Sequence, residues 1–147
     1  MTTVAQARLE INELFRDAWI ANGTSSSIPL VFENAQGSTP PSGTDANGRA
    51  KPWARVSIRH FTGEAETLGP VGLKRFLYTG MVTVEIYTAI GDGWQVGDAL
   101  CQVARAIFRG NSTASGVWFT EVGSLEIGRD TDWYRQDVTA RFSYEDR

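Results

Sequence analysis

One stretch of the sequence constrains the fold more than any other: residues 80–100, which read GMVTVEIYTAIGDGWQVGDAL. Its first half alternates apolar and polar side chains, as a strand with one buried face does. The buried face of this strand is predicted to be Val82, Val84 and Ile86. After a glycine-rich turn the apolar residues return at helical spacing, at Val96, Leu100, Val103, Ala104 and Ile107. A strand followed by an amphipathic helix is therefore predicted, with Gly110 closing the helix.

The turn between this strand and helix invites comparison with a phosphate-binding loop, which occupies the same place in nucleotide-binding proteins. The glycines are Gly91, Gly93 and Gly97, a spacing that matches neither the dinucleotide fingerprint nor the P-loop. Asp92 would repel an anion here and would suit the N-cap of the helix. We therefore predict a turn with a helix cap and no bound cofactor.

The N-terminal segment carries a second helical pattern. An apolar stripe runs through Val4, Ala7, Ile11, Leu14, Phe15 and Ala18. Thr3 and Gln6 fit a capping box at the start, and Asn22 with Gly23 supplies the stop. Leu9 and Ile20 lie off the stripe, so the sequence leaves open both a second covered surface and scattered exposure.

Three further segments, 53–61, 116–128 and 132–144, alternate as strands, and GRDTD is the predicted hairpin turn between the last two. Residues 33–52 hold three prolines and three glycines, and are predicted to form a long loop. The order of these segments predicts a single α+β domain over residues 1–147, with two helices packed on a mostly antiparallel sheet of about four strands.

Composition narrows the function classes. With 14 basic and 17 acidic residues, the formal charge of −3 gives no electrostatic footprint for a duplex-binding surface. No apolar run approaches the length of a membrane span, so no membrane partner is expected. The single cysteine, Cys101, and a start without a signal-peptide pattern lead us to expect synthesis in a reducing cytoplasm.

Residues that could carry chemistry are sparse. His60 is the only histidine and lies within a predicted strand, so it is expected to be structural rather than a general base. Cys101 lies off the helical stripe with no base nearby in sequence and is expected to be a partly buried thiol. We predict no enzyme activity and no catalytic, cofactor or metal site. The alternative is a small enzyme or ligand-binding module with Glu85, His60 or Tyr87 as its polar groups.

Five tryptophans are many for a chain of this length. Tryptophan is enriched as an anchor at protein–protein contacts, so some of the five are expected at an interface. The interface candidates are Leu9, Ile20, Trp53, Trp94 and Trp133. The alternative is that all five indoles are buried in the core or half-exposed.

The pattern as a whole resembles the tail terminator-like proteins of long-tailed bacteriophages. The resemblance covers most of the chain and rests on the following segments: TTVAQARLEINELFRDAW, VFENA, the PW-A-R-V strand start, ETLGPVGLKRFLYTGMVTVEIYT, GDGWQVGDAL with the helix ending IFRG, and DTDWYRQDVTARF. The segment from Gln36 to Lys51 is longer than this family leads us to expect.

The resemblance implies a structural protein of the virion tail, near the neck, that is assembled in the host cytoplasm. It implies a hexameric ring that caps the tail tube, ends polymerisation of the tube protein and joins the tail to the head connector. DNA would only pass through the bore, where Glu64, Glu66 or Asp92 would repel it if they line the channel. A neck or head–tail joining protein, one layer higher, is the alternative within this class.

Overall fold

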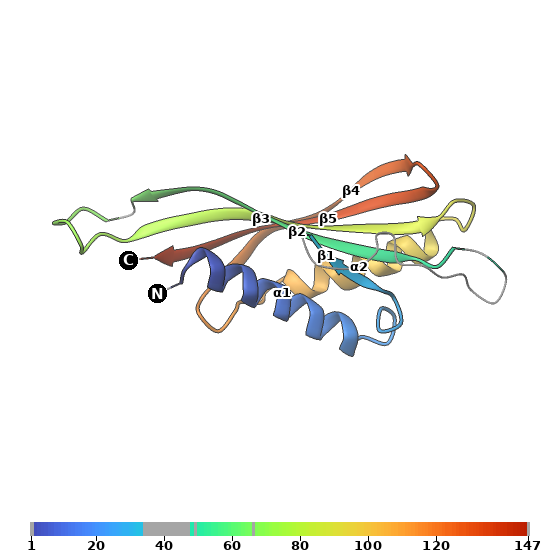
Figure 1. Cartoon of the computed structure of the whole chain (residues 1–147), viewed down its shortest axis with the longest axis horizontal. Coiled ribbons are helices and arrows are strands. Elements are labelled where there is room, and N and C mark those ends of the chain that lie inside the picture. Colours follow the sequence, from blue (N-terminus) through green and yellow to red (C-terminus); the bar gives the residue numbers. More distant parts are fainter. Residues whose placement is uncertain (1, 34–47, 49, 66, 147) are drawn as a thin grey trace.

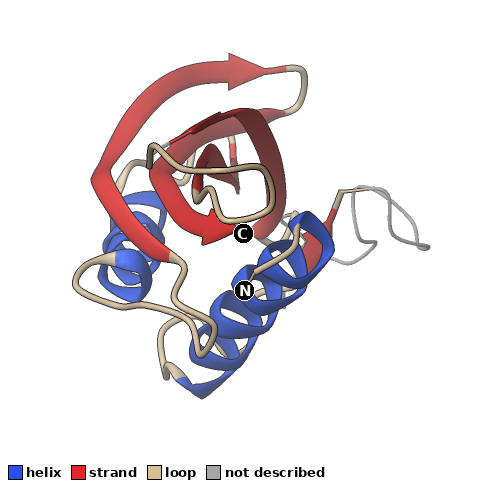
Figure 2. Cartoon of the chain, turned by 90° about the vertical axis from the view of Figure 1, so that its left-hand side faces the viewer, coloured by secondary structure: helices blue, strands red, loops and turns tan. Residues whose placement is uncertain are grey.

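The computed structural model describes residues 2–33, 48, 50–65 and 67–146, without the side chain of Thr62. Most of the loop predicted at 33–52 lies outside these residues. The elements follow the order α1 (Val4–Ala21), β1 (Leu30–Phe32), β2 (Trp53–Ala65), β3 (Phe76–Ala89), α2 (Gln95–Phe108), β4 (Trp118–Asp130) and β5 (Trp133–Asp146). Both helices lie on the same side of the sheet, as Figures 1 and 2 show.

The five described strands form one sheet in the order β1-β2-β3-β5-β4. All neighbours pair antiparallel except β1, which runs parallel to β2 with Leu30 opposite Ala54. The predicted α+β class is confirmed, but the prediction of about four strands missed β1. Three residues are too few to show an alternation, so no periodic signal marked this strand.

Helix α1 confirms the predicted caps and corrects its predicted stripe. Thr3 is the N-cap, and its hydroxyl accepts a hydrogen bond from the Gln6 amide at 3.1 Å. Asn22 is the C-cap. The buried residues are Ala7, Ile11, Phe15 and Trp19, while Val4 is exposed. The buried row therefore steps by four residues and includes a tryptophan that the predicted stripe omitted.

The turn before α2 confirms the predicted role of its glycines but not that of Asp92. Gly91 and Gly93 have φ angles of 94° and 75°, the left-handed region that favours glycine. The N-cap of α2 is Trp94, which makes no capping hydrogen bond through its side chain. Asp92 precedes the cap by two residues because the two left-handed glycines prolong the turn. At the other end Gly110, with a φ of 71°, closes the helix as predicted.

The core lies between the helices and the inner face of the sheet. The alternation predicted for β2 and β3 is confirmed, because the inner positions Ala54, Val56, Ile58, Val82, Val84 and Ile86 are all buried. Phe15 links the two helices, since its ring stacks on Phe108 of α2 at 5.4 Å between centroids. From β5, Val138, Ala140, Phe142 and Tyr144 complete this layer.

The bend predicted at Gly80 is present, and the extra residue lies in the neighbouring strand. Gly80 pairs with His60 and Tyr78 pairs with Gly63, so β2 bulges between these positions. The Phe142 ring packs over Gly80. A Cβ at this position would lie 2.3 Å from Phe142 Cζ and 2.4 Å from the Arg59 carbonyl oxygen. Only glycine fits here without a shift of backbone.

Replacing Gly80 with alanine therefore tests how tightly this bend is packed. We expect Gly80→Ala to lower the free energy of unfolding by about 1–3 kcal/mol, because the methyl group meets a ring and a carbonyl group. Gly23→Ala is the matched control, since a Cβ at Gly23 would meet nothing within 4 Å. Urea denaturation measures both variants. Equal stabilities would contradict the packing described at Gly80.

Candidate assembly surface

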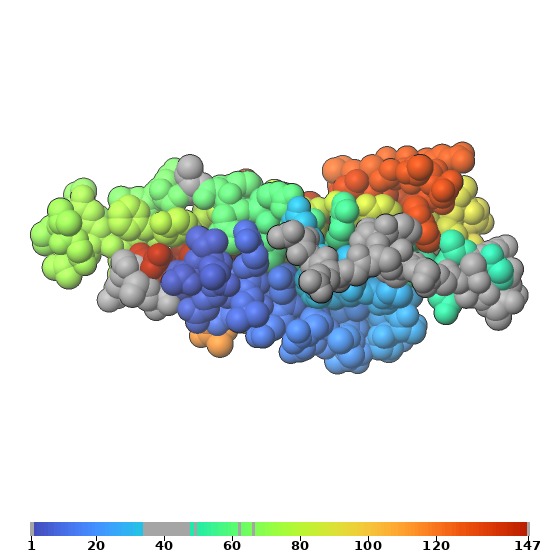
Figure 3. Space-filling view, in the orientation of Figure 1, coloured from blue at the N-terminus to red at the C-terminus, as the bar shows by residue number. Residues whose placement is uncertain are grey.

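Strands β2 and β3 continue past the helices as a hairpin arm, defined here as the described residues 63–65 and 67–78. Pairing inside the arm joins Gly63 to Tyr78 and Ala65 to Phe76. The end of β5 supports its base, where Tyr144 pairs with Tyr78 and the two rings stack at 5.5 Å. Figures 1 and 3 show the arm, in yellow-green, as one extreme of an elongated molecule.

The tip of this arm presents aliphatic side chains to solvent. Leu68 and Val71 are fully exposed, at 103% and 98%, and Leu73 is 74% exposed. The tip is nevertheless an ordered turn, because the Leu73 amide donates to the Pro70 carbonyl at 3.2 Å and the Arg75 amide donates to Thr67 Oγ1 at 2.9 Å. Three exposed aliphatic residues within six positions exceed the single exposed residues that soluble domains tolerate.

Sequence reasoning missed this tip. The apolar residues of segment 62–72 show neither helical nor strand spacing, so periodicity gives no prediction for them. The available signal was the presence of Leu68, Val71 and Leu73 among glycine and proline, in a turn too short to bury them.

The opposite end of the molecule carries a second apolar surface. Here the β3–α2 turn and the β4–β5 turn enclose a hollow of about 360 Å³, the far-end pocket. Its walls are Ala89, Ile90, Gly91, Gly93, Trp94, Arg129 and Tyr134. Trp94 is 67% exposed, so this interface candidate stands free in the isolated chain. In Figures 1 and 3 these turns lie at the end away from the arm.

The structure places the other four candidates differently. Leu9 and Ile20 are exposed on α1. Trp133 is half-buried. Trp53 is only 4% exposed, so this interface candidate is covered in the isolated chain. Its indole stacks on Tyr87 at 4.3 Å and meets the Trp133 ring edge-on at 6.1 Å, so the chain itself covers it.

A polar network crosses the outer face of the sheet, away from the helices. Glu85 of β3 accepts hydrogen bonds from Arg55 Nε at 2.7 Å, from Tyr87 Oη at 2.9 Å and from Arg135 at 3.2 Å. Arg135 also holds Asp137 at 2.8 Å. Glu85 and Asp137 are buried, and burial together with the Glu85 contact raises the pKa of Tyr87 to about 12. The network satisfies its own charges and fixes β2, β3 and β5 side by side.

The three residues of the ligand-binding alternative are not brought together. His60 shares the inner face with Ile58 and packs edge-on against Phe142 at 5.1 Å. Burial, with a smaller effect of Arg8, lowers the His60 pKa. Glu85 and Tyr87 point to the outer face, where they bond to each other. The sheet therefore separates His60 from the pair formed by Glu85 and Tyr87.

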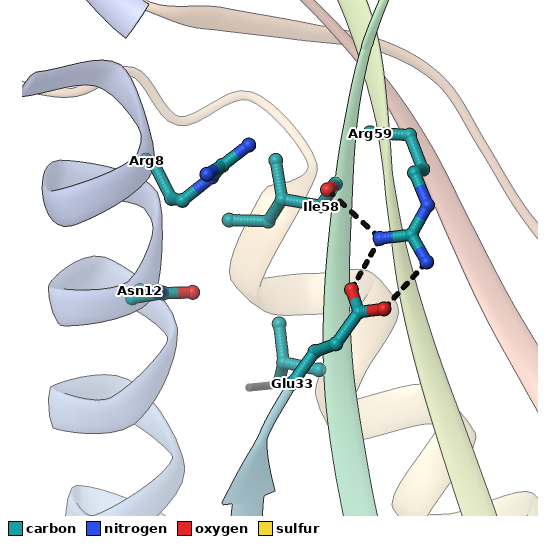
Figure 4. A pocket seen from close by; sticks show the side chains of 6 residues that line it. Arg8, Asn12, Glu33, Ile58 and Arg59 are labelled. Atoms are coloured by element: carbon teal, nitrogen blue, oxygen red, sulfur yellow. Dashed lines mark hydrogen bonds and ion pairs between the residues drawn. The ribbon is translucent and has the colours of Figure 1, made fainter. Parts of the chain in front are cut away.

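A polar hollow of about 300 Å³ lies between α1 and the β1–β2 edge. Figure 4 shows Arg8 and Asn12 extending into it from α1, while Glu33 and Arg59 bind each other. That pairing lowers the Glu33 pKa, with Arg59 as the main cause. Because Arg59 already has a carboxylate partner, we assign this hollow to the structural link between the helix and the sheet edge.

Cys101 is buried in α2, more completely than expected, and burial raises its pKa to about 11. Within the described ranges, no three histidine, cysteine, aspartate or glutamate residues lie close enough to hold a metal ion. Among the same residues, no helix has both the length and the apolar character needed to cross a bilayer.

Glu85→Gln tests the outer-face network. The amide keeps the shape of the carboxylate but loses the charge between two guanidinium groups, so we expect the free energy of unfolding to fall by about 1–3 kcal/mol. Glu145→Gln is the control, because Glu145 and Arg75 form an exposed ion pair 3.5 Å apart. Its loss should lower the free energy of unfolding by only about 0–1 kcal/mol. A loss for Glu85→Gln no larger than that of the control would show that the network adds no stability.

The state of Cys101 is tested by thiol labelling at pH 8. Its raised pKa keeps the thiol protonated there, and its burial blocks the reagent. We expect labelling in the native protein to be more than about 100-fold slower than in urea, since the thiol must wait for the helix to open. Ser26→Cys, at an exposed position, is the control and should label rapidly. Rapid native labelling of Cys101 would identify it as an accessible nucleophile.

Comparison with known proteins bears on the fold. No family model matches the chain, and no curated protein matches it. A solved structure of a protein without a functional name matches along nearly the full length of both chains, covering 97% of this chain and 96% of the other. The TM-score is 0.65 and the sequence identity is 15%. This chain therefore shares its α+β fold with that protein, and identity at this level carries no inference about function.

Proposed function

We propose that this protein is a structural subunit of a long-tailed bacteriophage, a tail terminator-like protein that assembles as a ring on the finished tail tube. Its resemblance in sequence to that family supports the proposal. So does the placement of exposed apolar side chains at both ends of one elongated subunit, at Leu68 and Val71 on the arm and at Trp94 on the far end. These are surfaces for protein contacts.

The single observation that carries the proposal is the exposed tip of the arm. Burying a leucine or valine side chain contributes about 1.5–3 kcal/mol relative to leaving it in water. Leu68, Val71 and Leu73 forgo this contribution in the isolated chain although the turn that holds them is ordered. Association recovers it. An assembly subunit therefore explains the arm better than a domain that acts alone.

The mechanism of termination is steric. One face of the ring matches the last layer of tube protein and the other face offers no copy of the surface that the tube protein recognises, so growth ends. With a formal charge of −3 per chain, a ring of six would carry about −18, which lets DNA pass without strong binding.

The test combines the purified chain with tube protein. We expect the chain to bind the ends of tubes and to shorten the length distribution seen by electron microscopy when it is added during polymerisation. Light scattering of the bound species should give the mass of a closed ring. Tube protein polymerising alone is the control.

Two outcomes would overturn the proposal. Tubes of unchanged length, with no protein at their ends, would remove the terminator function. Unchanged tubes together with binding to purified head connector would instead identify a neck or head–tail joining protein.

A further inference from the structure

We propose that the tip of the hairpin arm of one copy docks into the far-end pocket of the next copy, which links identical chains head to tail. The inference rests on the proposed function in one respect, since it takes a second copy of this chain as the partner of the arm. It goes further by naming the two surfaces that meet.

The two surfaces are matched in polarity. The arm offers Leu68, Val71 and Leu73, and the far-end pocket offers the side chains of Ile90 and Trp94. A central aromatic residue beside a hollow is the usual anchor of a protein interface. Joining the two surfaces would bury apolar area that both leave in water.

The two surfaces are also complementary in charge. The tip of the arm, residues 67–75, contains Lys74 and Arg75 and no carboxylate, while Glu64 and Glu66 precede it in the sequence, so the basic charge is confined to the tip. The two turns around the far-end pocket carry three aspartates, Asp92, Asp130 and Asp132, and one arginine, Arg129; of these, Asp130 also lies 3.6 Å from Arg135 of its own chain. Opposite charges at the rim of an interface set orientation and disfavour wrong partners. Two arms are both basic at the tip, so they repel each other.

Geometry favours a head-to-tail chain of copies over a symmetric pair. The arm and the far-end pocket lie at opposite ends of the long axis of the molecule (Figure 1). A contact between two different surfaces of identical chains is heterologous, and it generates a ring when the rotation closes. A subunit that presents one surface at each end meets this requirement.

The arm is already in a shape that can dock. Its base is fixed by the pairing of Tyr78 with Tyr144, and its tip by the hydrogen bond from the Arg75 amide to Thr67. Docking therefore orders little additional backbone, which reduces the entropic cost of association. The arm also makes one ion pair with β5, between Arg75 and Glu145 at 3.5 Å. This pair is exposed and weak enough for Arg75 to exchange Glu145 for a carboxylate of the next copy.

Cysteine crosslinking tests the contact directly. Val71→Cys places a thiol on the tip, and Arg129→Cys places one on the wall of the far-end pocket while keeping Ile90 and Trp94. The two variants, given different masses by a tag, are mixed and oxidised, alone and in the presence of tube protein. We expect the mixed dimer to be the main crosslinked product, identified by mass spectrometry.

The controls isolate this contact from random collision. Leu125→Cys, an exposed position in the middle of β4, replaces Arg129→Cys and should give no mixed dimer above background. The wild-type chain reports any contribution of Cys101, which is buried. A predominance of Val71–Val71 dimers would show that tips meet tips. No mixed dimer under either condition, or crosslinking of Val71→Cys to tube protein, would also overturn the proposal.

A charge reversal gives a second readout. Lys74→Glu should weaken self-association about tenfold, and Asp132→Lys in the partner copy should restore it. Weakening without restoration would mean that Asp132 does not face the arm.

The outcome is separable from that of the proposed function. Crosslinked rings that leave tube length unchanged would keep the head-to-tail contact and remove the terminator role. Tubes that end at normal length without any crosslink would keep the terminator role and remove the head-to-tail contact.

Discussion

The structure depends on the cover that α1 and α2 give to one face of the sheet. Inner side chains such as Val84, Ile86 and Val138 are buried only because the two helices lie across them. The cover is shorter than the sheet. Where the helices end, β2 and β3 continue as the hairpin arm, and the apolar residues of its tip have nothing from their own chain to pack against. The exposed arm is thus a direct consequence of where the helices stop.

The opposite face of the sheet needs no such cover. Glu85, Asp137, Arg55 and Arg135 form a connected set of ion pairs and hydrogen bonds there, and Trp53 stacks on Tyr87. The polar residues that first suggest chemistry are therefore used to hold neighbouring strands together. At the two ends of the molecule, by contrast, apolar residues such as Leu68, Val71 and Trp94 remain exposed.

The sequence predicted well what periodicity encodes. Both helices, four of the five strands, the caps of α1 and the bend at Gly80 all follow from spacing or from glycine chemistry within a few residues. What it missed depends on contacts between distant segments. The three-residue β1 exists because β2 offers it an edge, and the burial of Trp53 depends on Tyr87, which lies 34 positions further along the chain. Asp92 fails as a cap because two left-handed glycines lengthen the turn.

For the candidate surface, the sequence identified Trp94 from its place in a turn but passed over Leu68, Val71 and Leu73. An aliphatic side chain is exposed when no other segment of the chain packs over it. Local sequence patterns do not show whether a distant segment does so. The surplus of tryptophan favours an interface, but it also selected Trp53, whose ring packs against Tyr87 and Trp133 within the chain.

The central claim is that the arm is exposed in the free subunit and covered in the assembly. Hydroxyl-radical footprinting of Leu68, Val71 and Leu73, in the free chain and in the chain bound to tail tubes, tests it most directly. The account predicts strong labelling of all three residues in the free chain and clear protection in the bound state. Equal labelling in both states would contradict it.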